Sequence, residues 1–178
     1  MYLKKIVCRD FLSIFLPVFF ILVLSNEHTK AEEYNLTFAV SGVVSSVEAN
    51  IGDKVKVGTI LAVLDHAPFD AERRAAVATY NLANLVLTLS EDRLEQSQEL
   101  FDALSISGEE LEKSKIEYAK SLSGYKVAKS QVEIATWRLQ QATLKSPFVG
   151  IVTAIPGYPG IVVNNNGFEK PIIVIKKE

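Results

Sequence analysis

A pair of heptad repeats, between about residues 70 and 143, constrains the fold of this chain more than any other feature. In both repeats the seam residues recur at alternating spacings of four and three, which is typical of a coiled coil. The first seam is formed by Ala76, Tyr80, Ala83, Leu87, Ser90, Leu94, Ser97, Phe101 and Leu104. The second is formed by Leu111, Ser114, Tyr118, Ser121, Tyr125, Ala128, Val132, Ala135, Leu139 and Ala142. Because neither arm can bury its seam alone, we predict two helices folded into one antiparallel hairpin.

Composition excludes several classes of function. The chain has 178 residues, the length of a single domain, and a formal net charge of −2. This balance provides no basic footprint for nucleic acid, so we expect no nucleic-acid partner. A single cysteine, Cys8, excludes an intramolecular disulfide and a CxxC metal or redox site.

The N-terminal segment has the pattern of an export signal. Lys4 and Lys5 precede an apolar run at residues 11–24, which is shorter than the roughly 20 residues of a membrane span. We therefore expect residues 1–31 to be a signal peptide, with cleavage after Ser25 or after Ala31, and the mature chain to be periplasmic. The alternative is an uncleaved anchor that tethers the chain to the inner membrane, although Arg9 and Asp10 are costly in hydrocarbon.

Short β-rich runs flank the two heptad repeats. Before them lie residues 36–40, 43–47 and 60–64, with turns at Gly52 and Gly58; after them lie residues 143–144, 151–155, 161–163 and 172–175. Each half has too few strands to close a core, so we predict that the two halves pair into one β-sandwich. The expected class is α+β, with half-sandwiches at residues 35–66 and 144–176 and a helical insertion at residues 67–143.

Three segments carry a resemblance to a known family. These are SGVVSSV at residues 41–47, IGDKVKVGTILAVLD at residues 51–65 and KSPFVGIV at residues 145–152. They resemble the two halves of the lipoyl-like (biotinyl-type) domain in periplasmic adaptors, the membrane fusion proteins of the HlyD-like group. The resemblance implies a lipoyl-like β-sandwich split by an inserted antiparallel α-helical coiled-coil hairpin.

The same resemblance implies a function in export. Adaptors of this group bridge an inner-membrane transporter, of RND or ABC type, and an outer-membrane channel, and they assemble as homo-oligomers. They usually continue into a β-barrel domain and a membrane-proximal domain, whereas this sequence stops at Glu178. The expectation is therefore a minimal adaptor or a truncated product. The competing hypotheses are an envelope coiled-coil scaffold and a competitor of full-length adaptors.

No motif for catalysis or for a cofactor is evident. The sequence contains no nucleophile elbow, phosphate-binding loop or HExxH run, and His28 and His66 have no spaced ligand partners. The lysine turn that carries lipoate or biotin in related domains falls where the helical insertion stands, and Lys54 lies in a different turn. We predict a protein that is not an enzyme and that holds no cofactor and no metal.

The loop between the two arms is predicted to be a docking site. Ser107 and Glu110 form a capping-box pattern that starts the second helix. Residues 100–111 resemble the adaptor tip that meets an outer-membrane channel, with Leu104 where a glycine is usual. The expected docking residues are Leu104, Ile106, Ser107 and Leu111. Simple capping of a turn is the alternative; it explains Ser107 but leaves Leu104 and Ile106 exposed.

A second apolar stripe lies away from the predicted seam. We call the six residues below the apolar stripe and predict that they pack against a neighbouring copy. The alternative is local packing on the sandwich. The stripe consists of Leu82, Leu85 and Leu89 on the first arm and Val127, Ile134 and Trp137 on the second.

Overall fold

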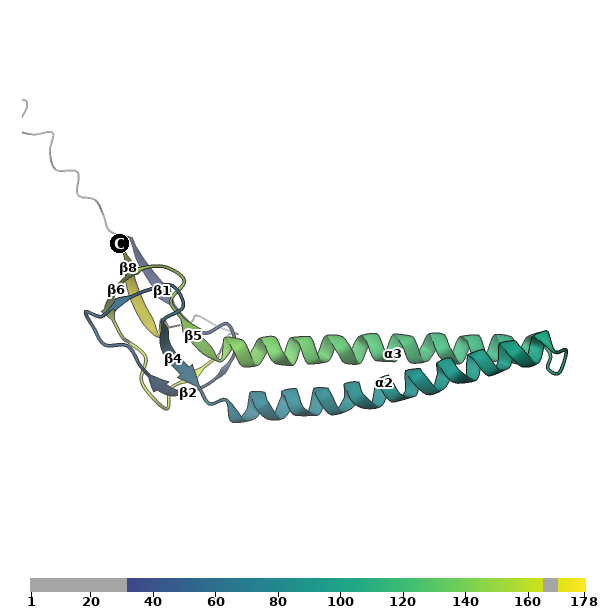
Figure 1. The fold of residues 1–178 in the computed structure, drawn as a ribbon. Helices are drawn as coiled ribbons and strands as arrows, with labels where there is room; N and C mark the ends of the chain where they lie inside the picture. Colours follow the sequence, from purple (N-terminus) through teal and green to yellow (C-terminus); the bar gives the residue numbers. More distant parts are fainter. Residues whose placement is uncertain (1–31, 165–169) are drawn as a thin grey trace, which may run out of the picture. The chain divides into compact units, whose positions relative to one another are not determined.

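The computed structural model describes residues 32–164 and 170–178, so the predicted signal peptide or anchor lies outside the described residues. Within this part of the chain, two long helices separate two groups of short strands (Figure 1). The first group is β1 (Glu33–Leu36), β2 (Gly42–Val47), β3 (Lys54–Val55) and β4 (Ile60–Leu64), followed by α2 (Ala67–Asp102) and α3 (Gly108–Gln141). The second group is β5 (Thr143–Lys145), β6 (Gly150–Ala154), β7 (Val162–Val163) and β8 (Ile173–Lys177).

The strands form two four-stranded sheets, and each sheet mixes the two groups. One sheet has the order β1-β8-β6-β3 and the other has the order β5-β4-β2-β7, with antiparallel pairing throughout. In the first sheet Val55 of β3 is opposite Gly150 of β6; in the second Ala62 of β4 is opposite Leu144 of β5. Neither group of strands could close a sheet alone. The prediction that both halves join in one sandwich is confirmed.

The core lies between the two sheets and is almost wholly aliphatic. Apolar side chains from both groups of strands meet there, and burying each of them stabilises the fold by about 1.5–3 kcal/mol. The largest fully buried side chains are Phe38, Val44, Leu61, Leu64, Val152, Ile172, Ile173 and Ile175.

The structure corrects one expectation about the strands and confirms another. The expected strand at residues 36–40 is wrong, because β1 ends at Leu36 and residues 37–41 form no ladder. Phe38 and Val40 are nevertheless buried, so their alternation with Thr37 and Ala39 reports core contact rather than strand pairing. Gly52 and Gly58 have φ values of 93° and 84°, which confirms the predicted glycine turns.

The hairpin of α2 and α3 replaces a short connection between two paired strands. It leaves the sheet after β4 and returns at β5, the strand that pairs with β4. At 1.5 Å per residue, helices of 36 and 34 residues extend about 50 Å. Phe69 and Ala142, one near each end of the hairpin's base, belong to the sandwich core. The base of the hairpin is therefore fixed by core packing.

Candidate functional site

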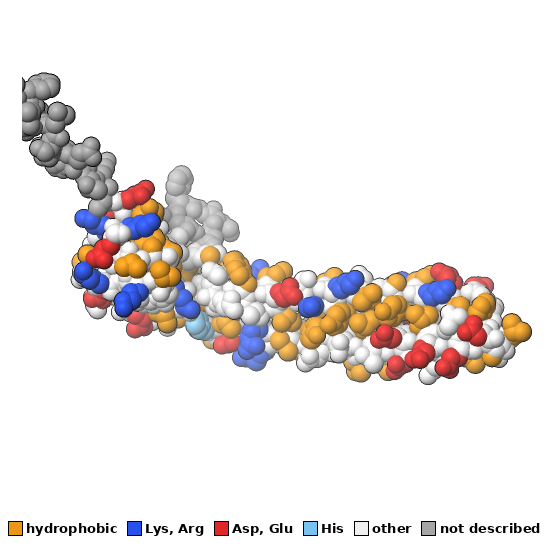
Figure 2. All heavy atoms as spheres, turned by 45° about the horizontal axis from the view of Figure 1, so that its top comes forward, with side chains coloured by type: hydrophobic (Ala, Val, Ile, Leu, Met, Phe, Trp, Pro, Cys, Tyr) orange, Lys and Arg blue, Asp and Glu red, His pale blue; other side chains and the backbone are white. Residues whose placement is uncertain are grey.

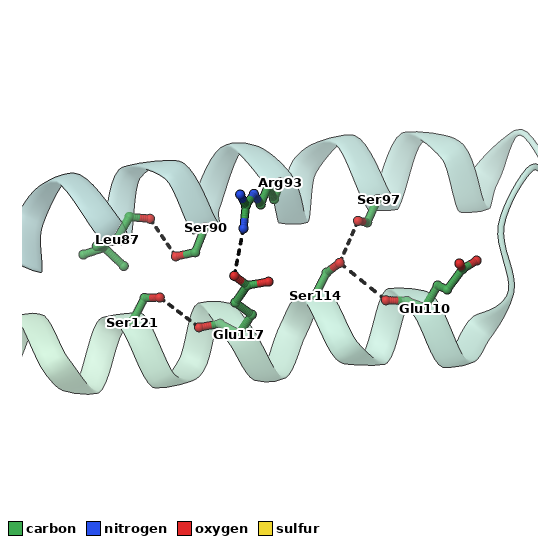
Figure 3. Close-up of polar contacts among 8 residues, drawn as sticks. All are labelled: Leu87, Ser90, Arg93, Ser97, Glu110, Ser114, Glu117 and Ser121. Carbon is green, nitrogen blue, oxygen red and sulfur yellow. Dashed lines mark hydrogen bonds and ion pairs between the residues drawn. The ribbon is translucent and has the colours of Figure 1, made fainter.

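The seam of the hairpin follows the predicted heptads over most of its length. Side chains from Ala76 to Ser97 on α2 and from Leu111 to Ala142 on α3 are buried or half-buried at the predicted seam positions. Small and polar residues occupy several layers, and the hydroxyls of Ser97 and Ser114 lie 2.7 Å apart (Figure 3). Close helix packing is possible there because neither side chain is large.

The predicted seam fails at the end of α2. Phe101 is 37% exposed and Leu104 is 92% exposed, because α2 ends at Asp102 and Leu104 lies beyond the helix. The placement of Leu104 in the seam is therefore wrong.

The start of α3 is built as the sequence predicts. The Ser107 hydroxyl accepts a hydrogen bond from the Glu110 backbone N–H at 3.2 Å, and the Glu110 carboxylate accepts one from the Ser107 N–H at 3.3 Å. This reciprocal pair is a complete capping box, which confirms the prediction. It fixes the direction in which the chain leaves the loop at residues 103–107.

The four predicted docking residues are not equally accessible. Leu104 is almost fully exposed and Ser107 is exposed, whereas Ile106 is half-buried and Leu111 is only 6% exposed. Leu111 is therefore a seam residue and cannot offer its side chain to a partner in this conformation. Ile106, which was expected to be exposed like Leu104, is partly buried because the loop turns it partly inward.

All six residues of the apolar stripe are exposed. Their exposed fractions range from 48% for Trp137 to 62% for Leu82, so neither helix packs this stripe on the sandwich. The alternative of local packing is thus not observed. Val86 is 45% exposed and belongs to the same surface, although it was not one of the predicted stripe residues. Its position directly before the seam residue Leu87 is the signal that could have identified it.

Three exposed apolar residues, from both helices, share one broad side of the hairpin. Leu82 and Val86 line a shallow groove with Thr79, and Ile134 lines a second groove that also includes Thr79. Because Thr79 belongs to both grooves, Leu82, Val86 and Ile134 face the same side. Figure 2 shows hydrophobic side chains collected along the middle of the hairpin, with charged side chains toward either end.

Two ion pairs between the helices border this surface. Near the base Arg138 pairs with Glu72, and both residues line the second groove. Toward the tip Arg93 and Glu117 are 2.9 Å apart (Figure 3). Each of these two residues is one heptad from a groove residue, which places the pair on the same side. The surface is therefore a mainly apolar area that includes Lys120, with a charged pair at each end.

The junction of β4 with α2 provides a helix cap. The Asp65 carboxylate accepts a hydrogen bond from the Ala67 N–H at 3.0 Å, whereas the side chain of His66 makes no capping bond and lies 3.3 Å from the Thr143 hydroxyl. The cap of α2 is thus provided by Asp65 and not by the neighbouring His66.

The part of the chain that the structure describes has neither a metal-binding cluster nor a membrane-spanning helix. Within residues 32–164 and 170–178, no group of three or more His, Cys, Asp and Glu could hold a metal ion. In the same ranges, no helix is both long and apolar enough to span a membrane.

A barrel-like sandwich with a long helical hairpin inserted between paired strands defines a class of proteins, the membrane fusion proteins that act as adaptors in efflux pumps. Residues 33–167 match the family model described as "CzcB-like, barrel-sandwich hybrid domain", and the chain belongs to this family. The fold class predicted from the sequence is confirmed.

Two relatives from Escherichia coli K12 are similar to the chain in sequence. The uncharacterized protein YdhJ is 29% identical over 126 residues, which are 70% of this chain and 43% of that protein. The multidrug resistance protein MdtE is 30% identical over 114 residues, which are 63% of this chain and 29% of that protein. The chain thus matches less than half the length of either relative.

Solved structures agree with the fold. A MacA-MexA chimeric protein, with the Pseudomonas aeruginosa MexA α-hairpin domain, matches with a TM-score of 0.57 and 25% identity, over 82% of this chain and 48% of that one. A putative efflux transporter from Bacteroides eggerthii DSM 20697 matches with a TM-score of 0.60 and 24% identity, over 83% and 40% of the two chains.

Proposed function

We propose that this chain is a periplasmic adaptor subunit of an efflux or secretion pump, which links an inner-membrane transporter of RND or ABC type to an outer-membrane channel. The observation that carries the proposal is the hairpin itself: it is inserted between paired strands of the family's sandwich domain and ends in an exposed leucine, Leu104. Exposed apolar residues at the end of a long projection are typical of a protein contact.

In this proposal the two parts of the molecule have different roles. The hairpin acts as a spacer of about 50 Å, and its loop at residues 103–107 meets the channel. The sandwich holds the base of the hairpin through Phe69 and Ala142, which lie in its core. In this proposal the loop that meets the channel is therefore held by a packed domain.

Crosslinking from the loop tests the channel contact. A photoreactive amino acid at Ser105, which is exposed and beside Leu104, should capture an outer-membrane channel protein in cells. The same group at Asn81, an exposed position far along α2 from the loop, is the matched control and should not capture it. Capture from neither position favours an envelope scaffold. If a channel is captured, deletion of the gene should reduce export for an adaptor and increase it for a competitor of full-length adaptors.

The apolar stripe supports a second proposal, contact with another copy of the chain. Single exposed apolar residues are normal on a protein surface, but this hairpin exposes six, and they lie on both helices. Contact between two copies would bury the stripe. Ion pairs such as Arg93 with Glu117 would remain at the solvent-accessible rim of the interface.

Paired charge substitutions test this contact. Leu85→Glu with Ile134→Glu should convert oligomers to monomers, measured by chemical crosslinking and light scattering, because both carboxylates would be buried in the interface. Asn81→Glu with Ala119→Glu adds the same charge at exposed positions outside the stripe and should leave assembly unchanged. Unchanged assembly of the Leu85/Ile134 variant would contradict the proposal.

A further inference from the structure

The backbone of Leu104 has an unusual conformation. Its φ is 57°, and within the described ranges it is the only residue other than glycine with a positive φ. A leucine in this left-handed region is strained, because its Cβ crowds the adjacent carbonyl oxygen. The side chain is 92% exposed, so packing within this chain does not compensate for the strain.

The strain has a clear structural origin in the way α2 ends. The Ser105 N–H donates to the Leu100 carbonyl at 2.8 Å, and the Leu104 N–H donates to the Phe101 carbonyl at 2.9 Å. These two hydrogen bonds form the Schellman motif, which closes many helices and places its left-handed residue directly after the C-cap. Glycine is the preferred residue at that position, because it adopts a positive φ without a steric cost. Leucine is therefore a poor choice for folding alone.

The charges around Leu104 indicate what could contact it. Residues 94–112 include six acidic residues and no lysine or arginine. Two of the six, Glu109 and Glu112, pair with Lys113 and Lys115 of α3. The last turn of α2 contains no basic residue, although cations are favoured at a helix C-terminus. Figure 2 shows acidic side chains gathered over the distal part of the hairpin. The remaining carboxylates give the surface around the exposed leucine a net negative charge.

We propose that Leu104 is an apolar anchor for the outer-membrane channel and that it inserts into an apolar pocket with a basic rim at the periplasmic end of that channel. This inference rests on the proposed adaptor function and adds the chemistry of the contact. The Schellman motif holds the side chain outward before binding, so little conformational freedom is lost when the partner covers it. The acidic residues around it supply complementary charge to the rim.

Three substitutions at Leu104 separate folding from recognition. Leu104→Gly and Leu104→Asn remove the apolar side chain with residues that tolerate a positive φ, and Leu104→Met keeps an apolar side chain of similar size. Each full-length variant is tested against the channel protein that the wild-type chain captures from Ser105, purified and immobilised. We expect Gly and Asn to weaken binding about ten- to a hundredfold, because a buried leucine is lost, and Met to bind nearly as well as the wild type. Gly should raise the melting temperature or leave it unchanged.

The possible outcomes distinguish this inference from the function on which it rests. Equal binding by the wild type and by the Gly and Asn variants overturns the anchor, while the adaptor function stands. Failure of the wild type to capture any channel overturns both. Added salt should weaken wild-type binding, because it screens the contact between the acidic surface and a basic rim. Binding that does not change with salt contradicts the basic rim.

Discussion

The phenol hydroxyls of Tyr80 and Tyr125 lie 3.1 Å apart across the seam between α2 and α3, and their rings form a tilted pair with centroids 5.3 Å apart. The hydrogen bond with Tyr125, and then repulsion from a Tyr125 anion and the desolvation of the phenol, raise the pKa of Tyr80 above its ordinary value. The folded hairpin therefore favours the protonated phenol. This pair couples the packing of the seam to pH.

The first prediction is an alkaline loss of stability. Because the pKa of Tyr80 is raised in the folded state, its contribution is complete below about pH 10 and is lost as the pH rises through the raised value. Helicity measured by circular dichroism at increasing temperature should show a melting temperature that falls above pH 10. The double variant Tyr80→Phe/Tyr125→Phe should lose less over the same range. Identical alkaline profiles for the two proteins would rule out this coupling.

The second prediction concerns the seam bond between Ser97 and Ser114. Either single substitution by alanine leaves one half-buried hydroxyl without its partner across the seam, whereas the double substitution removes both groups. We expect the double variant to lose less free energy of unfolding than the two single variants lose in total. The difference should be about 0.5–1 kcal/mol in urea unfolding. Ser121→Ala is the control for helix propensity, because its hydroxyl bonds only to the Glu117 carbonyl in its own helix (Figure 3). Strict additivity would show that the two hydroxyls are not coupled.

The third prediction concerns the capping box at the loop. Ser107→Ala removes the acceptor for the Glu110 N–H and should cost about 1 kcal/mol, whereas Ser107→Asp retains an acceptor and should cost less. Hydrogen exchange of the amides at residues 108–111 should accelerate in the Ala variant. Ser105→Ala, also in the loop but outside the cap, should leave these amides protected. Equal exchange in both Ala variants would mean that the cap does not hold the start of α3.

The sequence was sufficient to predict the hairpin because heptad spacing reports helix contact directly. Ser90, Ala128 and Ala135 are all buried at their predicted seam positions. The pattern carries less information at the ends. The heptad continues through Phe101 and Leu104, and because no glycine directly follows α2, the sequence contains no ordinary signal for where the helix ends.

The strands and the loop depend on contacts that local patterns do not contain. β3 and β7 have two residues each and exist only because β6 and β2 lie beside them. The outward position of Leu104 and the partly inward position of Ile106 follow from the path of the loop, which the cap and the Schellman bonds determine together. The resemblance to adaptor tips located the candidate site, but it could not assign these orientations.

The fourth prediction tests the sandwich that holds the hairpin. A Cβ at Gly150 of β6 would lie 2.4 Å from the Lys176 carbonyl oxygen and 2.7 Å from Ile175 Cγ2 in β8. Backbone atoms in a paired strand cannot move away as a flexible side chain can, so Gly150→Ala should destabilise the protein by about 3 kcal/mol or more. Gly124→Ala is the matched control: a Cβ there meets nothing within 4 Å, and alanine in a helix interior should add about 0.5–1 kcal/mol. Thermal unfolding of both variants measures the difference. A Gly150→Ala protein as stable as the wild type would mean that β6 and β8 are not packed as closely as described.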